Sequence, residues 1–307
     1  MGIYRRARRI AGKAKRAVTR GGRFVRDVPQ LSRIKAEREQ FKQEKENYYT
    51  DRQILYDQAH NMRVFLANKY IQGKGIEIGA TYLPLPVPHE ATVQYVDIIS
   101  EQELYKLYPD IRKHKLAHVD IIDDGEKLGK VKNNSQDFVI ANHFFEHTIS
   151  PISTLLNFYR VLKQEGVMFM SVPDKRYTFD RLRDVTPLER LVDFHAHPNK
   201  AEAAKPSLFL EVTQKIESWP TKKQQEARAK ELMDQNYSIH YNVWAQHDLL
   251  ELILHSVRQH KLKLDVECFM KNGHEVIVVL RKEPTLPKEN AEIERHKKAH
   301  AKKAKKK

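Results

Sequence analysis

Short apolar runs of β-type residues alternate with helical patterns through most of the chain, and this alternation limits the fold more than any other feature. We expect strands at about 75–79, 92–98, 116–122, 137–141, 167–172, 262–269 and 274–280. Helices are expected at about 51–71, 101–107, 151–163 and 246–259. Strands that alternate with helices form parallel βαβ units. An Asn272-Gly273 turn joins the last two strands as a hairpin. We therefore predict an α/β sheet that ends in an antiparallel pair.

Two segments depart from this alternation. Only about a dozen residues separate the first two strands, near the minimum for a parallel crossover, so we expect a turn there in place of a helix. Residues 174–240 are polar with short apolar clusters, and we interpret them as a helical insertion that covers the strand ends. The predicted organisation is a basic extension at 1–50, helical or partly disordered, a folded domain at 51–282 and a Lys-rich tail at 283–307.

The first two strands end on residues that suit a ligand. Glu77 and Gly79 close the first strand, and Asp97 closes the second, 18 residues after Gly79. Ligands of open parallel sheets bind beyond the carboxyl ends of the strands. A glycine there lets the backbone approach the ligand, and a carboxylate about 20 residues further on accepts the hydroxyl protons of a ribose. We therefore predict a nucleoside site at Glu77, Gly79 and Asp97. An ordinary strand–turn at Gly79 and a helix cap at Asp97 are the alternatives.

The third and fourth strands end in further candidate residues. Asp123 and Asp124 follow the third strand, where one carboxylate can receive an adenine amino group; an ordinary acidic turn is the alternative. Asn142 and His143 follow the fourth strand, and we expect both to face the cofactor or the substrate.

A mixture of charged and aromatic residues follows the fifth strand. Asp174, Arg176 and Tyr177 lie at the same edge of the predicted sheet, which makes them candidates for substrate contact; a solvated loop is the alternative. His240 and Trp244 lie where the insertion meets the last helix, and we expect them to close the pocket from above.

Residues 143–147 read H-F-F-E-H, which matches the inverted zinc-protease motif. That motif needs a helix, so that both histidines share one face and chelate the metal. Here the segment follows a strand directly, and Ser150-Pro151 opens the next helix three residues later. We therefore expect no metal, and we interpret Glu146 and His147 as polar groups that fix the loop.

The net charge of +15 is concentrated at the two ends of the chain. Residues 1–26 hold ten basic residues and residues 295–307 hold eight, with no acidic residue in either stretch. Removing these 18 charges leaves the stretch between them at about −3, which argues against a basic catalytic face for nucleic acid. The ends suit an anionic membrane surface or another polyanion, and solvated disordered tails are the alternative.

Cysteine content and hydropathy indicate the compartment. Cys268 is the single cysteine, which fits a reducing compartment. No run approaches the ~18 apolar residues of a membrane span. We expect a cytoplasmic protein. The basic ends would also allow it to bind peripherally at the inner membrane surface.

Four motifs together resemble the class I S-adenosylmethionine-dependent methyltransferases. They are E-x-G at 77–79, V-D at 96–97, D-F-V-x-A-x-H-x-x-E-H at 137–147 and R-V-L-K-x-x-G at 160–166. The resemblance covers roughly residues 52–282. It implies a Rossmann-like, doubly wound sheet of seven strands in the order 3-2-1-4-5-7-6 with the last strand antiparallel. It also implies S-adenosylmethionine bound through Gly79, Asp97, Asp124 and the loop at Asn142. Thr81 and Leu83 occupy positions where the family pattern has glycine.

The resemblance also suggests an acceptor. Residues 171–183, SVPDKRYTFDRLR, resemble a bacterial subgroup found beside cell-surface glycan enzymes, which implies methylation of an oxygen on a sugar, a glycan or a related small acceptor. A hydroxyl nucleophile needs a general base, and a histidine near its ordinary pKa suits that role; we predict His143, with His240 as the alternative. A non-catalytic binding module that docks through its basic ends, and an RNA methyltransferase, are the competing functions.

Overall fold

The computed structural model describes residues 56–284 and five earlier residues, 36, 39, 40, 42 and 43. Apart from those five, the predicted basic extension lies outside the described residues. The Lys-rich tail beyond Pro284 also lies outside the described residues. The membrane or polyanion partners expected for the two ends therefore stay predictions. Contacts within the chain divide it into Met1–His60 and Asn61–Lys307. The fold below is that of the second part.

Seven strands form one sheet in the order β3-β2-β1-β4-β5-β7-β6. Neighbours from β3 through β5 run parallel, and β7 lies antiparallel to β5 and β6. The strands are Lys74–Ile78 (β1), Thr92–Asp97 (β2), Ile121–Ile122 (β3), Gln136–Asn142 (β4), Leu162–Pro173 (β5), Leu264–Asn272 (β6) and Glu275–Lys282 (β7). The predicted strand order and the antiparallel last strand are confirmed.

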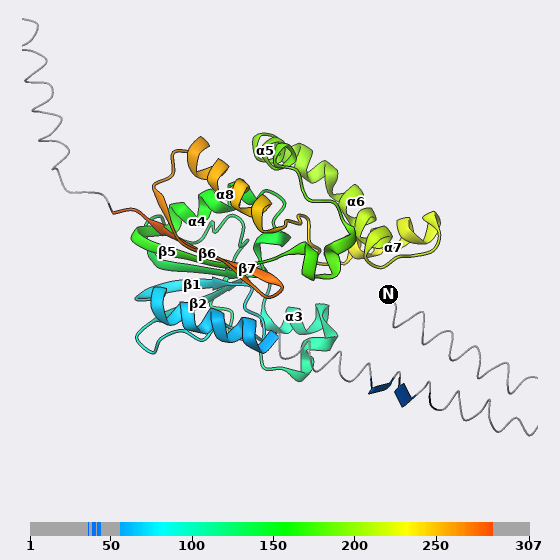
Figure 1. Cartoon of the computed structure of the whole chain (residues 1–307), viewed down its shortest axis with the longest axis horizontal. Helices are drawn as coiled ribbons and strands as arrows, with labels where there is room; N and C mark the ends of the chain where they lie inside the picture. Colours follow the sequence, from blue (N-terminus) through cyan, green and yellow to red (C-terminus); the bar gives the residue numbers. More distant parts are fainter. Residues whose placement is uncertain (1–35, 37–38, 41, 44–55, 285–307) are drawn as a thin grey trace, which may run out of the picture. The chain divides into compact units, whose positions relative to one another are not determined.

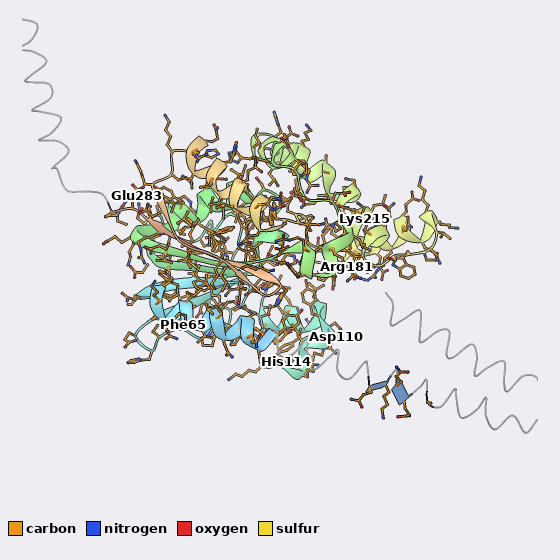
Figure 2. All side chains as sticks on the ribbon, in the orientation of Figure 1. Phe65, Asp110, His114, Arg181, Lys215 and Glu283 are labelled. Carbon is orange, nitrogen blue, oxygen red and sulfur yellow. The ribbon has the colours of Figure 1, made fainter. Side chains whose placement is uncertain are left out.

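Alternate residues of the central strands enter two apolar layers, because these strands are buried on both faces. The helices α4 (Pro151–Val161) and α8 (Gln246–Gln259) cover one face, and helical residues 61–70 cover the other (Figure 1). The first layer includes Val139, Met168, Val278, Phe158 and Leu252. The second layer includes Ile140, Phe169, Val279, Leu66 and Ile71. Phe65 in the same helix is exposed and lies outside this layer (Figure 2).

The chain between β1 and β2 contains no helix, as the short spacing predicts. The helix α3 (Glu101–Leu107) follows β2 at its predicted position, and Ser100 caps it by accepting the Glu103 N–H. The strand β3 is shorter than expected. Asp120 takes part in its pairing by accepting the Tyr95 N–H with its side chain, and only Ile121 and Ile122 continue the parallel ladder.

The insertion after β5 is mostly helical and has a small core of its own. It contains two short 3₁₀ turns, η3 (Lys175–Tyr177) and η4 (Phe179–Leu182), and three helices, α5 (Leu188–Ala196), α6 (Pro198–Lys215) and α7 (Lys222–Asp234). Phe194, Phe209 and Leu232 pack together in that core. Within residues 56–284, no helix combines the length and the apolar character that crossing a membrane requires.

Candidate functional site

The ends of β1 and β4 form an open position for a ligand. Gly79 has φ +65°, a conformation that favours glycine, and a side chain built there would approach only Phe144, at 3.8 Å. The strands β1 and β4 pair as far as Glu77 and Ile140, so Gly79 and Asn142 each lie two residues beyond the last pair, at the same edge of the sheet. The side-chain oxygen of Asn142 is buried and has no hydrogen-bond partner in the described structure. Such an oxygen calls for a partner supplied from outside the chain.

Asp97 lies at the end of β2, next to this position. Its Oδ1 accepts the Ile98 N–H at 2.8 Å. Burial raises the pKa of Asp97, although hydrogen bonds from Ile98 and Ile99 act against the shift. A carboxylate at this strand end is suited to a ribose, as the sequence predicts, and that role stays a prediction.

The turn after β3 brings its backbone close to the same place. Asp123 accepts the N–H groups of Asp124 and Lys130, and Asp124 accepts that of Glu126, so both carboxylates fix the turn. A Cβ at Gly125 would lie 2.5 Å from Ile78 and 2.7 Å from Phe144. The turn is therefore packed against the end of β1, and the adenine contact predicted for Asp123 or Asp124 stays a prediction.

Phe144 is a residue of this region that the sequence argument missed. Its ring lies beside both Gly79 and Gly125, and its centroid is 6.4 Å from that of Phe158. The ring thus forms a shared apolar wall for the ends of β1 and β4 and the turn after β3. Its position directly after Asn142-His143 was the one signal available in the sequence.

Glu77 shapes the loop that replaces the crossover helix. Its side chain is 1% exposed, and its two oxygens lie 3.0 and 3.1 Å from the Leu85 nitrogen, whose N–H donates to them. Burial raises the pKa of Glu77 to about 8, although the Leu85 hydrogen bond and the charge of Arg63 oppose the shift. Glu77 therefore fixes the loop after Gly79, and the cofactor contact predicted for it stays a prediction.

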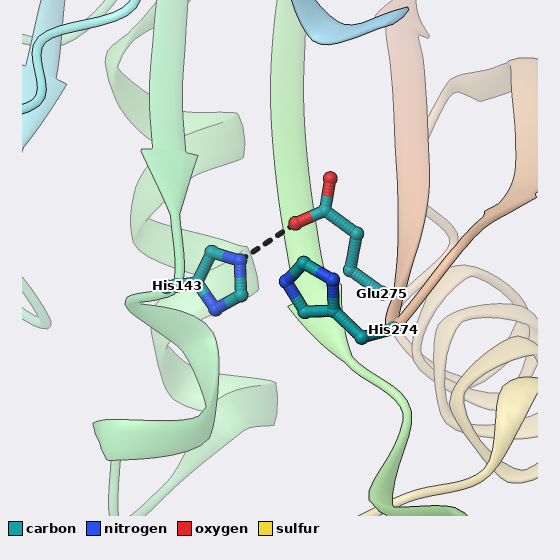
Figure 3. A group of neighbouring side chains, drawn as sticks. All are labelled: His143, His274 and Glu275. Carbon is teal, nitrogen blue, oxygen red and sulfur yellow. Dashed lines mark hydrogen bonds and ion pairs between the residues drawn. The ribbon is translucent and has the colours of Figure 1, made fainter. Parts of the chain in front are cut away.

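His143 lies at the centre of the polar residues beyond β4. Its φ is +49°, and its N–H donates to Ser171 O at 2.8 Å. Its Nε2 is 2.6 Å from Glu275 Oε2 (Figure 3), and its Nδ1 is 3.5 Å from Glu146 Oε1. Burial alone would lower the pKa of His143, but Glu146 and Glu275 outweigh it and raise the pKa to about 9. The expectation of an ordinary imidazole pKa is wrong, because two carboxylates stabilise the charged ring.

His240, the second predicted base, comes from the end of the insertion. Its Nδ1 is 2.6 Å from Asp180 Oδ2, and its ring packs against those of His147 and Phe179. The structure brings His240 within 3.9 Å of Glu146 and therefore next to the residues that follow β4.

The predicted substrate residues are divided between surface and interior. Asp174 is fully buried and accepts hydrogen bonds from Arg176. Trp244 is 1% exposed and stacks on Phe145. Arg176 and Tyr177 have about half of their surface in solvent, at 45% for the Arg176 side chain and 51% for Tyr177. The exposed pair can meet a substrate directly, whereas Asp174 and Trp244 are placed to support the loop.

A family model described as a methyltransferase domain matches residues 31–253. The chain belongs to this methyltransferase family. S-adenosylmethionine is accordingly its cofactor, and the open position at Gly79 with the unpartnered Asn142 oxygen fits such a group. A search of curated proteins finds no match to this methyltransferase.

Several solved structures are similar to the methyltransferase at low identity. One, named as a candidate Zn-dependent alcohol dehydrogenase from Rhodobacter sphaeroides, is 14% identical, with a TM-score of 0.45 over 72% of this chain and 89% of that one. A methyltransferase from Aquifex aeolicus is 12% identical, with a TM-score of 0.37 over 69% and 83% of the two chains. One from Thermotoga maritima is 14% identical, with a TM-score of 0.41 over 77% and 96%.

Proposed function

We propose that this methyltransferase methylates an oxygen of a sugar, a glycan or a related small acceptor. The observation that carries the proposal is the group of histidines and carboxylates beyond β4, which lies directly after Asn142 at the predicted cofactor position. Methyl transfer to a hydroxyl requires a group that removes its proton. The sequence predicts His143 and His240 for that role; because the pKa of His143 is raised to about 9, its ring is charged at neutral pH and can take the proton only in more alkaline solution.

Each part of the site has a defined task in this proposal. Gly79, Asp97 and Asn142 hold S-adenosylmethionine, which supplies a methyl group bound to a positively charged sulfur. The acceptor oxygen attacks the methyl carbon in line as the carbon–sulfur bond breaks, and its proton passes to a side chain beyond β4. Most of the acceleration then comes from holding the two reactants in line. The exposed Arg176 and Tyr177 are suited to the polar groups of a saccharide.

Calorimetric titration with S-adenosylmethionine and S-adenosylhomocysteine tests the cofactor site. We expect micromolar binding, and a loss of at least ~10-fold in Asp97→Ala because charge-assisted hydrogen bonds to the ribose disappear. The matched control is Asp265→Ala, an exposed strand aspartate on β6. Absence of binding at millimolar ligand would refute the proposal and favour a binding module without catalysis.

An acceptor screen then tests the substrate class. Transfer of labelled methyl to saccharide acceptors, with none to RNA, supports the proposal, and the reverse result refutes it. His143→Ala and His240→Ala should each lower turnover by at least ~10²-fold if that histidine takes the proton, while cofactor affinity is unchanged.

The basic ends of the chain lead to a separate proposal about partners. We propose that they bind anionic surfaces, because residues 1–26 and 295–307 carry 18 basic residues and no acidic one. Sedimentation with vesicles that contain anionic lipid should show binding that falls with salt and disappears when both ends are removed. Equal binding to neutral vesicles would contradict it.

A further inference from the structure

Glu146 is a buried carboxylate whose two oxygens have no hydrogen-bond partner among the described residues. It lies in the 3₁₀ turn η2 (Phe145–His147) and is 1% exposed. Buried charges in proteins are normally paired and hydrogen-bonded or coordinate a metal, because removing them from water is costly. The His143 ring is the nearest cationic group, with Nδ1 3.5 Å from Glu146 Oε1, and neither Glu146 oxygen has a partner at hydrogen-bonding geometry in the described part of the chain, so the carboxylate is available to a further cationic ligand.

Two further histidine nitrogens lie near the Glu146 carboxylate. Glu146 Oε1 lies 4.0 Å from His147 Nε2 and 3.9 Å from His240 Nε2. The three ligand atoms all lie within 4.8 Å of one another. His147 is the next residue in the chain, whereas His240 comes from the far end of the insertion. Only the fold brings the three groups together.

The other ring nitrogen of each histidine is already fixed. His147 Nδ1 lies 2.9 Å from the carbonyl of Ile239, to which it donates because a carbonyl can only accept. His240 Nδ1 lies 2.6 Å from Asp180 Oδ2. In the neutral ring, both Nε2 atoms then carry lone pairs that face Glu146. Metal-binding histidines are held in this way, with the distal N–H donated to a carboxylate or a backbone carbonyl.

We propose that Glu146, His147 and His240 bind one divalent transition-metal cation, for which Zn²⁺ is the reference ion. A Zn²⁺ ion lies ~2.0–2.2 Å from nitrogen and oxygen ligands, so two ligands of one ion are at most ~4.2 Å apart. The two distances from Glu146 to the histidines, 3.9 and 4.0 Å, fall within this limit, and the two histidine ligand atoms lie within 4.8 Å of each other, so a small side-chain movement brings the group around one ion. A cation between these groups would pair the carboxylate and both lone pairs at once.

A neighbouring group has similar residue types but does not need a cation. His143, His274 and Glu275 also lie close together (Figure 3). Glu275, however, accepts hydrogen bonds from His143 at 2.6 Å and from Asn272 at 2.7 Å, and Arg63 is 3.3 Å away. Its carboxylate is thus satisfied by the protein, which distinguishes it from that of Glu146.

The proposed ligands leave room for further groups on the ion. Two histidines and one carboxylate occupy three positions, and catalytic zinc sites keep a further position for water or substrate. A metal lowers the pKa of a hydroxyl bound to it, so His240 would be a ligand in this site rather than a general base. The inference goes beyond the proposed function, and its test does not depend on the acceptor.

The test is metal uptake by the full chain after treatment with a chelator. Calorimetry with Zn²⁺ should show one tight site per chain, and loading with Co²⁺ should give visible absorption bands of a site with nitrogen ligands. A wild-type protein that takes up no Zn²⁺, or whose Co²⁺ spectrum equals that of the hydrated ion, would overturn the proposal without any variant. Binding of S-adenosylmethionine by the metal-free protein tests the proposed function separately.

Variants assign the ligands. Glu146→Gln, His147→Ala and His240→Ala should each weaken Zn²⁺ binding by more than ~100-fold, since loss of an orienting partner alone costs ~10- to 100-fold. Asp180→Asn should show that smaller loss. The matched control is His247→Ala, which removes a histidine with a 79% exposed side chain and should bind as the wild type does. Wild-type affinity in folded His147→Ala and His240→Ala, checked by circular dichroism, would overturn the assignment.

Discussion

Replacing Glu77 by glutamine should make the protein's stability less dependent on pH. The pKa of Glu77 is raised from 4.5 to about 8, chiefly because its carboxyl is buried. The folded state therefore holds this proton more tightly than the unfolded state does. The stabilisation is complete below pH 4.5, falls as the pH rises towards 8, and is lost above it. At 1.36 kcal/mol per pKa unit, the wild type loses about 5 kcal/mol over this range through Glu77.

The variant isolates this effect because glutamine cannot ionise and still offers an oxygen to the Leu85 N–H. Its added amide N–H₂ changes stability by an amount that does not vary with pH. The free energy of unfolding is measured by urea denaturation, followed by circular dichroism, at intervals from pH 5 to 9. Between these pH values, the free energy of unfolding of the variant should increase by several kcal/mol relative to that of the wild type. Glu90→Gln, an exposed residue of the same loop, serves as the control and should show a constant difference. Parallel curves for Glu77→Gln and the wild type would refute the reasoning.

Three further substitutions test the local structure. Thr81→Gly should stabilise the protein by about 1 kcal/mol in urea denaturation, because Thr81 has φ +47° and relief of ~1–3 kcal/mol of strain exceeds the entropic cost of glycine; a clear loss would contradict this. Arg183→Leu should cost about 3–5 kcal/mol in the same assay, because the buried Arg183 lies 3.0 Å from Asp180; a loss below ~1 kcal/mol would argue against a structural role. Gly125→Ala should cost about 1–3 kcal/mol and weaken cofactor binding by displacing Phe144, and unchanged calorimetry would count against the shared wall.

Part of the candidate site follows from strand ends alone. Because carboxyl ends of parallel strands meet at one edge of a sheet, the positions of Gly79, Asp97 and Asn142 are predictable from the chain. What their side chains contact is not. Glu77 accepts a hydrogen bond from Leu85, and Asp174 accepts one from Arg176. These partners depend on the path of the loops, which the periodicity of the sequence does not predict. The pKa of His143 departs from its usual value for the same reason, because Glu275 is 132 residues away in the sequence.

The sequence by itself determined the alternation of strands and helices, the missing crossover helix and the final hairpin. These features depend on periodicity, spacing and turn residues, all of which are properties of residues close together in the sequence. Only the tertiary structure decided the surroundings of Glu146. The H-x-x-E-H pattern places His143 and His147 close to Glu146 in the chain, and both lie near its carboxylate, but the third histidine there, His240, is brought from the insertion and held by Asp180. Such a group forms because a long insertion packs back onto a strand end, and that contact is set by burial across the whole domain rather than by any local pattern.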